Sequence, residues 1–174
     1  NSLQTKKDFL KYYKINSTCI YNPLNTKRIK KLSKQKVSII FKKNKLKIIS
    51  IGRLSKEKDH ITFLKALRLL KNQIKYEAVI MGKGKLRNKL EKFIEENNLN
   101  KHVKLIGYKP NPYPYIKQSD FVILTSLHEG LPNVLLEALI LKKFIISSNC
   151  LSGPKEILLN GKGGALFKVG DYNE

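Results

Sequence analysis

The sequence predicts an α/β fold in which a doubly wound parallel sheet is covered by helices on both faces. Two observations carry this prediction. From Lys47 onward, short apolar runs alternate with segments of helical periodicity, and this alternation is typical of parallel strands joined by crossover helices. The 174 residues, 41% of them hydrophobic, are also enough to bury the core of one domain.

Six apolar runs are predicted to be strands, and they cover residues 46–52, 76–82, 103–107, 121–126, 144–149 and 165–169. The segments between them that have the period of a helix are residues 60–72, 85–99, 132–141 and 154–159. Pro132 suits the first turn of its helix, because the N–H that proline lacks has no partner there. The alternating order predicts a Rossmann-like sheet whose ligand site lies beyond the carboxyl ends of the strands.

Residues 1–45 do not continue this pattern. They contain one helix-like piece at residues 5–14, a stretch without periodicity and a Lys-rich run. We therefore predict that residues 1–45 are the tail of a preceding domain and a linker, and that residues 46–174 form the α/β domain. The chain starts without Met and ends soon after a strand-like segment, so a fragment of a longer protein is expected.

The net charge of +22 raises the question of an anionic partner. Residues 1–47 hold 14 basic side chains and one acidic side chain, so +13 of the excess lies in this part of the chain. Lys outnumbers Arg 31 to 4, whereas base readout and bidentate phosphate contacts favour Arg, which argues against nucleic acid. An AT-rich genome would produce this composition without any partner. An anionic membrane surface and a polyphosphate substrate are the functional alternatives.

The two cysteines, Cys19 and Cys150, lie far apart in the sequence and have no close-spaced partner for a metal site. A reduced cytoplasmic protein is the simplest interpretation. No apolar run approaches the roughly 20 residues of a membrane span, and the first residues have no signal-peptide core. The basic tail leaves open peripheral attachment to the inner face of the cytoplasmic membrane.

The turns after the first two predicted strands carry candidate phosphate contacts. Gly52 allows a tight turn, and Arg53 and Lys58 bring two cations to the mouth of the sheet, which suits a diphosphate. A basic surface loop is the alternative in a chain so rich in Lys. After the second strand, Gly82 opens a Gly-Lys-Gly turn that would let the backbone approach a ligand. The third glycine of a dinucleotide fingerprint is absent, which argues against a nicotinamide cofactor.

The loop at residues 107–115 follows the third strand and is stiffened by three prolines. The backbone near Tyr108 could lie against a flat base, although an ordinary rigid loop explains the same residues better.

Metal ligands are scarce in the chain, because its four aspartates lie far apart and form no D-x-D pair. A divalent metal on a diphosphate is therefore not expected, and cationic side chains would have to replace it.

The segment SLHEGLPNVLLEAL places Glu129 and Glu137 eight residues apart across a loop-to-helix junction. Two acids placed in this way can face opposite ends of one elongated polar ligand. The free amides of Leu131, Asn133 and Val134 at the start of the helix would offer donors to an anionic part of it. The alternative is a solvated loop carboxylate followed by a helix-surface carboxylate.

Taken in order, these motifs resemble the donor-binding half of the GT-B-fold retaining glycosyltransferases of the group 1 family. The resemblance covers about residues 46–174. Its motifs are G-R-L with a following Lys, a G-x-G turn, an I-G-Y loop, S-D-F-V-I-L-T-S, E-G-L-P-N-V-L-L-E-A-L, and G-P-K-E-I-L with a Gly-rich turn. Each motif alone is weak, but the ordered set is specific. Residues 1–45 then resemble the stretch that connects the acceptor domain to the donor domain.

The resemblance implies roles for the residues at the strand ends. Arg53 and Lys58 would neutralise the donor diphosphate and stabilise the leaving group, and Glu129 would contact hydroxyls of the donor sugar. These three residues form the implied catalytic set. Glu137 would accept hydrogen bonds from the ribose hydroxyls. The other implied donor-binding positions are Gly52, Gly82, Tyr108, Gly130, Leu131, Pro132, Asn133 and Val134.

The implied reaction is that of a hexosyltransferase. A sugar would pass with retention of configuration, and without a metal or other cofactor, from a nucleotide-sugar, expected to be a UDP-sugar, to a polysaccharide or lipid-linked oligosaccharide. Gly-Leu-Pro-Asn after Glu129 and Gly-Pro-Lys-Glu up to Glu156 depart from the common family pattern. These variants resemble enzymes of bacterial surface polysaccharides that use N-acetylhexosamines or galactose.

The acceptor domain and its usual catalytic His are missing from this sequence. The fragment is therefore expected to bind donor and to turn over little or nothing. A function of a different class remains open, namely a non-catalytic basic module that binds nucleic acid or anionic lipid, with the two glutamates structural.

Overall fold

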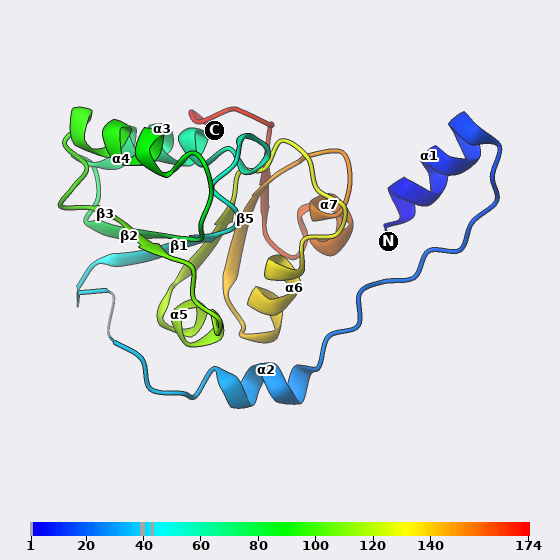
Figure 1. The fold of residues 1–174 in the computed structure, drawn as a ribbon, viewed down its shortest axis with the longest axis horizontal. Helices are drawn as coiled ribbons and strands as arrows, with labels where there is room; N and C mark the ends of the chain where they lie inside the picture. Colours follow the sequence, from blue (N-terminus) through cyan, green and yellow to red (C-terminus); the bar gives the residue numbers. More distant parts are fainter. Residues whose placement is uncertain (1, 39–40, 43) are drawn as a thin grey trace.

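The computed structural model describes residues 2–38, 41–42 and 44–174. Its six strands form one parallel sheet in the order β3-β2-β1-β4-β5-β6 (Figure 1). The strands are β1 Leu46–Ile51, β2 Tyr76–Met81, β3 Val103–Gly107, β4 Phe121–Leu124, β5 Phe144–Ser148 and β6 Ala165–Phe167. This order, in which the chain winds outward from β1 in both directions, confirms the predicted doubly wound sheet.

Helices cover both faces of the sheet, as Figure 1 shows. One face carries α3 (His60–Leu70) and α4 (Arg87–Glu96), and the other carries α5 (Tyr113–Gln118), α6 (Asn133–Ile140) and α7 (Pro154–Ile157). Short 3-10 helices lie at Lys56–Lys58 and Leu159–Gly161. The winding reverses between the adjacent strands β1 and β4, and such a reversal opens a crevice at the carboxyl ends of the strands.

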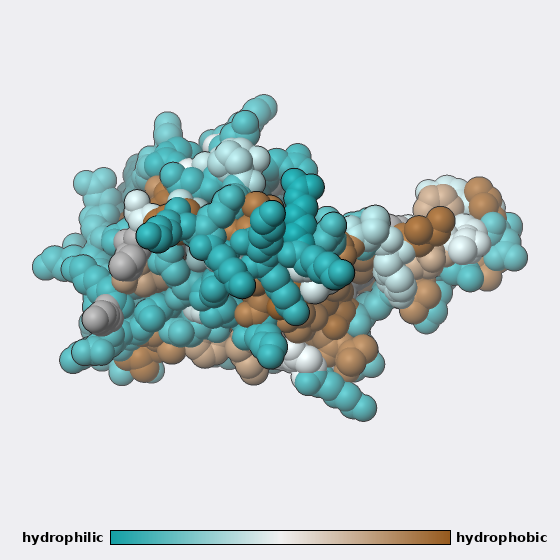
Figure 2. Space-filling view, turned by 90° about the horizontal axis from the view of Figure 1, so that it is seen from below, coloured by the Kyte–Doolittle hydropathy of each residue, from teal (hydrophilic) through white to brown (hydrophobic). Residues whose placement is uncertain are grey.

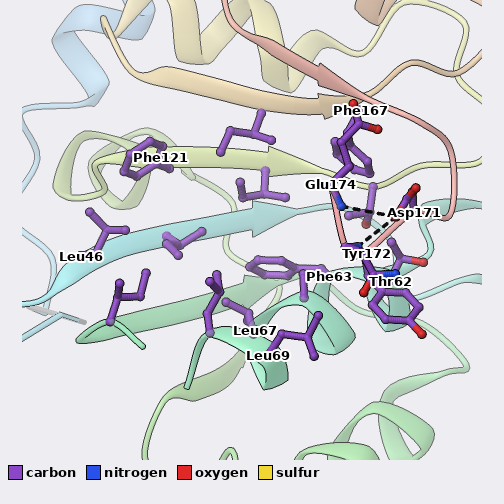
Figure 3. A pocket seen from close by; sticks show the side chains of 18 of the residues that line it. Leu46, Thr62, Phe63, Leu67, Leu69, Phe121, Phe167, Asp171, Tyr172 and Glu174 are labelled. Atoms are coloured by element: carbon purple, nitrogen blue, oxygen red, sulfur yellow. Dashed lines mark hydrogen bonds between the residues drawn. The ribbon is translucent and has the colours of Figure 1, made fainter. Parts of the chain in front are cut away.

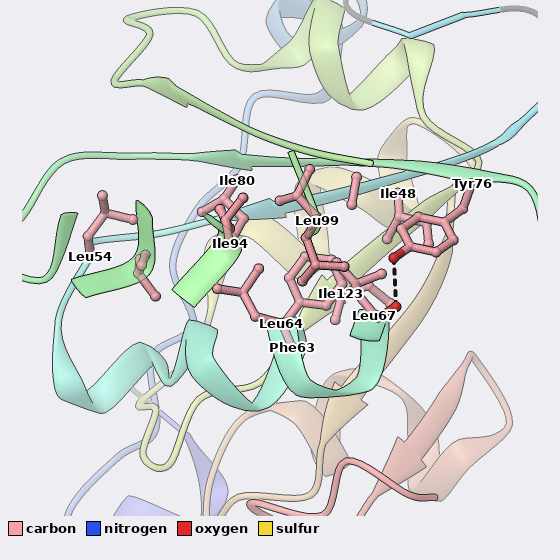
Figure 4. Close-up of a cluster of buried hydrophobic side chains, with 13 residues drawn as sticks. Ile48, Leu54, Phe63, Leu64, Leu67, Tyr76, Ile80, Ile94, Leu99 and Ile123 are labelled. Atoms are coloured by element: carbon pink, nitrogen blue, oxygen red, sulfur yellow. Dashed lines mark hydrogen bonds between the residues drawn. The ribbon is translucent and has the colours of Figure 1, made fainter. Parts of the chain in front are cut away.

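Successive side chains of the strands point into two different cores. The core on the α3 side is drawn in Figure 4 and includes Ile48, Leu64, Leu67, Ile80 and Ile123. Within it, the Tyr76 hydroxyl donates a 2.6 Å hydrogen bond to the Leu67 carbonyl. The core on the α6 side includes Ile49, Val79, Ile116, Val122 and Leu135. Because both faces are buried, the strands carry unbroken apolar runs rather than alternating ones.

The N-terminal part of the chain contains two helices, α1 (Leu3–Tyr13) and α2 (Thr26–Leu32). The first has no buried residue and projects away from the sheet, with hydrophobic atoms on its surface (Figures 1 and 2). The second was expected to be part of an irregular linker. It forms because Asn25 caps it by accepting from the Arg28 amide, and because Ile29 is buried as α2 packs on α5 and α6.

The boundary predicted between residues 45 and 46 coincides with the start of β1, but the division into two domains stays a prediction. Residues 1, 39–40 and 43 of the predicted linker lie outside the described residues. Among the helices that are described, the longest have 11 residues, about half of what a membrane span needs. None of them is long and apolar enough to cross a bilayer.

Two predictions about local structure were wrong. The loop predicted at residues 107–115 ends in helix α5, whose second residue is Pro114, a first-turn position that proline tolerates. Pro132 is not inside the first turn of α6 but is its N-cap, with an extended backbone at φ −72° and ψ 101°. The helix starts at Asn133, one residue later than predicted.

Candidate functional site

The crevice between β1 and β4 brings together two residues predicted from separate motifs. Lys58 lies in the turn after β1, and Glu129 lies in the loop after β4. Their side chains form an ion pair between Lys58 Nζ and Glu129 Oε1. The side chains are 21% and 10% exposed, so the pair is largely shielded from solvent while one side stays accessible.

Hydrogen bonds from the residues that follow β4 to backbone carbonyls of the turn after β1 fix the position of Lys58. The Thr125 hydroxyl bonds to the carbonyls of Lys58 and Asp59, at 3.0 and 2.9 Å. The Leu127 amide donates to the Glu57 carbonyl at 2.8 Å. These bonds tie the turn after β1 to the end of β4, and thereby hold the ammonium group at the crevice.

Gly52 leaves room for the methylene stem of Lys58. A Cβ atom added to Gly52 would lie 3.3 Å from Lys58 Cδ, closer than most side chains tolerate. A Cβ on Gly82 would overlap the Gly52 carbonyl oxygen, and one on Gly84 would overlap the Leu54 carbonyl. The Gly-Lys-Gly turn therefore serves close packing of two backbone turns, and its role in ligand binding stays a prediction.

Serine side chains hold the Glu129 loop. The Ser126 hydroxyl donates to Glu129 Oε1 at 2.6 Å, and the Ser152 hydroxyl donates to the Glu129 carbonyl. Behind them, the Ser148 hydroxyl donates to the Ser126 carbonyl at 2.6 Å. Ser126 and Ser148 are fully buried, so the carboxylate is fixed by groups that have little freedom to move.

Replacing Ser126 with Ala is expected to lower the free energy of unfolding by about 1.5 to 3 kcal/mol, because it removes a buried hydrogen bond to a charged group. Chemical denaturation of the two proteins measures this loss. Ser33→Ala is the matched control, since the Ser33 hydroxyl donates to a neutral carbonyl, that of Lys30, and should cost about 1 kcal/mol. Equal losses in the two variants would contradict the proposed importance of the carboxylate contact.

Arg53 is exposed in the same turn as Lys58, and its backbone is held by a buried histidine. His60 Nε2 lies 3.2 Å from the Arg53 carbonyl, and His60 Nδ1 lies 3.3 Å from the Ser50 hydroxyl. Because a carbonyl only accepts, Nε2 carries the proton, and Nδ1 accepts from the Ser50 hydroxyl. Burial lowers the pKa of His60 from 6.5 to about 4, which keeps the ring neutral at physiological pH.

The start of α6 forms the second part of the site. Leu131 and Pro132 are buried, while Gly130 is exposed. The Asn133 Oδ1 atom accepts a 2.7 Å bond from Asn22 Nδ2 of the linker. Within the described part of the chain, the amides of Asn133 and Val134 donate to no protein acceptor, as expected at a helix N-terminus.

Glu137 lies in the second turn of α6, apart from the ion pair of Lys58 and Glu129. Its Oε1 atom accepts a 3.2 Å hydrogen bond from the Tyr113 hydroxyl of α5. Burial raises the pKa of Glu137, and the bond from Tyr113 opposes that rise. The carboxylate is half-buried and held from one side, and its contact with a ribose stays a prediction.

Tyr108 follows β3 at the same edge of the sheet. Its ring is exposed, and Lys83 Nζ lies 5.6 Å from the ring centroid. This places an aromatic face and a further cation at the carboxyl ends of β2 and β3. The predicted contact with a base stays a prediction.

Sequence reasoning missed the residues that support the site. Tyr113 acts through Glu137, 24 residues further along the chain. Ser126 lies only three residues before Glu129, and His60 seven residues after Arg53, but neither spacing by itself marks a ligand site. For Tyr113, the available signal was Pro114, which favours a helix start and would have placed Tyr113 on an ordered element.

An apolar groove of about 380 Å³ lies elsewhere, on the α3 side of the sheet (Figure 3). Its lining includes Leu46, Phe63, Phe121 and Phe167 and the C-terminal residues 171–174. None of the residues predicted to bind donor lines it. Its apolar walls do not suit a charged nucleotide, so the crevice at the strand ends is the candidate site.

Metal-ligating side chains do not gather in the described residues, where no group of three or more His, Cys, Asp or Glu is placed to hold an ion. The ammonium group of Lys58 already pairs with Glu129, which is a poor environment for a divalent metal. Metal-free chemistry stays a prediction.

The chain is similar in sequence to known proteins. The family model described as "Glycosyl transferases group 1" matches residues 31–174. A curated relative is the N-acetylgalactosamine-N,N'-diacetylbacillosaminyl-diphospho-undecaprenol 4-alpha-N-acetylgalactosaminyltransferase of Campylobacter jejuni. It is 32% identical over 154 residues, which are 88% of this chain and 40% of that protein.

Two solved structures share the fold. A glycosyltransferase from Rickettsia africae superposes with a TM-score of 0.83 at 20% identity, over 98% of this chain and 48% of that one. S. aureus TarM, solved in complex with Fondaparinux, alpha-GlcNAc-glycerol and UDP, gives a TM-score of 0.69 at 27% identity, over 79% of this chain and 29% of that one. This chain spans less than half the length of each protein. The chain belongs to the group 1 glycosyl transferases and has the fold of the C-terminal half of a GT-B glycosyltransferase.

Proposed function

We propose that this chain forms the donor site of a retaining glycosyltransferase that uses a UDP-sugar. The observation that carries the proposal is the pairing of Lys58 with Glu129 at the crevice between β1 and β4. A cation and a carboxylate at one point suit a ligand that has a diphosphate next to a sugar rich in hydroxyls. Glu137, in the second turn of α6, supplies a second carboxylate for the ribose.

Each end of the donor meets a different group. Arg53 and Lys58 neutralise the diphosphate, and the amides of Asn133 and Val134 at the start of α6 add donors to it. Glu129 accepts from hydroxyls of the sugar, in place of part of its bond to Lys58. Glu137 accepts from the ribose hydroxyls, and Tyr108 lies beside the base.

The reaction follows from these charges. The bond between the sugar anomeric carbon and the diphosphate oxygen breaks, and the cations stabilise the negative charge that the leaving nucleotide gains. The acceptor hydroxyl attacks the same face of the sugar, which retains the configuration, and its proton passes to the leaving phosphate oxygen. No side chain needs to form a covalent bond, and no metal takes part.

The names of relatives support the substrate classes. The C. jejuni relative is named for transfer of N-acetylgalactosamine to an undecaprenol-linked diphosphate, and TarM was solved with UDP. We therefore propose an N-acetylhexosamine as the donor sugar, and a lipid-linked oligosaccharide or polysaccharide as the acceptor. The acceptor would be held by a preceding domain at the inner face of the cytoplasmic membrane. The basic tail would meet the anionic surface of that membrane. The 174-residue chain alone would bind donor with little turnover.

The proposal is tested by calorimetric titration of the chain with UDP, GDP and DNA. Binding of UDP is expected, and Glu137→Ala should weaken it about 5- to 150-fold, which corresponds to 1 to 3 kcal/mol for a lost hydrogen bond to a charged group. Glu91→Ala is the control, because Glu91 forms only an exposed ion pair with Arg87 on α4. No nucleotide binding, together with DNA binding that falls steeply with salt, would favour a basic binding module instead.

A further inference from the structure

The hydrogen bond between Tyr113 and Glu137 joins two helices that lie far apart in sequence. Tyr113 is the first residue of α5, and Glu137 lies within α6. We propose that Tyr113 is a positioning residue that aims the Glu137 carboxylate at the ribose, and that Asn111 couples this pair to the linker helix α2. The proposal rests on the ribose-binding role of Glu137 given above.

The two oxygen atoms of Glu137 are in different situations. Oε1 accepts from the Tyr113 hydroxyl at 3.2 Å. Oε2 accepts no hydrogen bond from the described residues, and it is not a fully buried atom left without a partner. One oxygen is thus anchored to the protein, while the other is left for a donor hydroxyl on a ligand.

Anchoring matters because a Glu side chain has three rotatable bonds. Without the Tyr113 bond, the carboxylate would sample several rotamers, and a ligand would have to select the productive one. The bond also favours the charged form of Glu137 against the effect of burial, and a charged carboxylate accepts hydrogen bonds from hydroxyls more strongly than a neutral acid does.

Tyr113 is itself fixed through Asn111. The Asn111 Oδ1 atom accepts from the Tyr113 amide at 3.2 Å. The Asn111 Nδ2 group donates to the carbonyl of Leu32, the last residue of α2, at 3.1 Å, and to Gln35 Oε1 in the turn after α2 at 2.6 Å. The Asn111 side chain therefore ties the first turn of α5 to the linker helix.

The surroundings of the pair are also set by α2. Burial and the nearby Glu137 raise the pKa of the Tyr113 hydroxyl, and the charge of Arg28 on α2 opposes that rise. The hydroxyl therefore remains protonated and able to donate at physiological pH. Helix α2 also packs directly on α5 and α6, so a shift of the linker would move both partners of the hydrogen bond.

The experiment compares two ligands that differ only at the ribose. Calorimetric titration with UDP and with 2′,3′-dideoxy-UDP gives the ratio of their dissociation constants, which reports the contacts to the ribose hydroxyls alone. Tyr113→Phe is expected to lower the preference for UDP by about 5- to 10-fold, the equivalent of one hydrogen bond. A tyrosine with a merely structural role would weaken both ligands equally and leave the ratio unchanged.

Two further variants separate the possible failures. Glu137→Ala should abolish the preference, and if it does not, the ribose assignment itself is wrong. If Glu137→Ala abolishes the preference and Tyr113→Phe leaves it intact, the ribose assignment stands and the positioning role of Tyr113 is overturned. Tyr12→Phe, at an exposed tyrosine of α1, is the matched control and should change neither ligand.

The coupling to the linker has its own test. Asn111→Ala is expected to reduce the UDP preference as much as Tyr113→Phe, and the double variant should reduce it no further, because both act through one chain of contacts. Thermal melting of each variant confirms that it is folded. An unchanged preference in Asn111→Ala, or fully additive losses in the double variant, would overturn the coupling.

Discussion

Replacing Lys58 with Met is expected to weaken binding of UDP by about 100-fold, equivalent to 2 to 3 kcal/mol for the loss of a charged hydrogen bond to the diphosphate. Methionine keeps an unbranched apolar stem over Gly52, where the methylene groups of Lys58 lie. The variant thus removes the charge with little change in packing. Calorimetry measures the loss of affinity, and an unchanged affinity would exclude Lys58 from the diphosphate site.

The same substitution is expected to destabilise the fold more than Glu129→Gln does. Loss of Lys58 leaves the Glu129 carboxylate, only 10% exposed, with the Ser126 hydroxyl as its remaining side-chain donor among the described residues. Loss of the Glu129 charge leaves the Lys58 ammonium group without its partner. The Lys58 side chain is 21% exposed, so water solvates it more easily than it solvates the Glu129 carboxylate. Removing one partner of a fully buried pair costs about 3 to 5 kcal/mol, and the partial exposure here reduces the expected cost to about 2 kcal/mol.

A double-mutant cycle isolates the interaction between the two side chains. Lys58→Met with Glu129→Gln should cost less than the sum of the single changes, with a coupling energy of about 1 kcal/mol in chemical denaturation. Lys92→Met is the matched control, because Lys92 and Glu96 form an exposed pair on α4 and should contribute no more than about 0.5 kcal/mol. Additive costs at Lys58 and Glu129 would show that the pair is not coupled.

The sheet was predictable from the sequence because burial on both faces leaves a strong pattern. Each predicted strand overlaps an observed strand, and the predicted helices correspond to α3, α4, α6 and α7. The edge at which Lys58 and Glu129 meet was predictable for the same reason. Parallel strands bring their carboxyl ends to one edge, so residues that follow different strands become neighbours.

Short helices and tertiary contacts were less predictable. Helix α5 has only six residues, and the residues just before it, Pro110, Asn111 and Pro112, favour a loop. Helix α2 depends on packing against α5 and α6, which no local pattern records. The bonds of Tyr113 to Glu137 and of Ser126 to Glu129 likewise depend on side-chain geometry that appears only when the loops are folded.

Acidification from pH 7 to pH 4 is expected to remove about 3 kcal/mol of folding stability through His60 alone, since each pKa unit corresponds to about 1.4 kcal/mol. The ring is 3% exposed, and burial lowers its pKa from 6.5 to about 4. Between these pKa values the unfolded chain binds a proton that the folded chain does not. The contribution is therefore fully present above pH 6.5 and is lost as the pH falls toward 4.

The measurement is the free energy of unfolding as a function of pH, compared between the natural chain and His60→Gln. Glutamine offers an amide that can donate to the Arg53 carbonyl, as His60 Nε2 does, but it does not titrate. Carboxylates contribute equally to both curves, so the difference between the two slopes from pH 6.5 to pH 4 belongs to His60. His128→Gln, at an exposed histidine, should keep the full slope. Parallel curves for the natural chain and His60→Gln would mean that the buried ring takes up its proton without strain, and that the turn carrying Arg53 does not depend on a neutral imidazole.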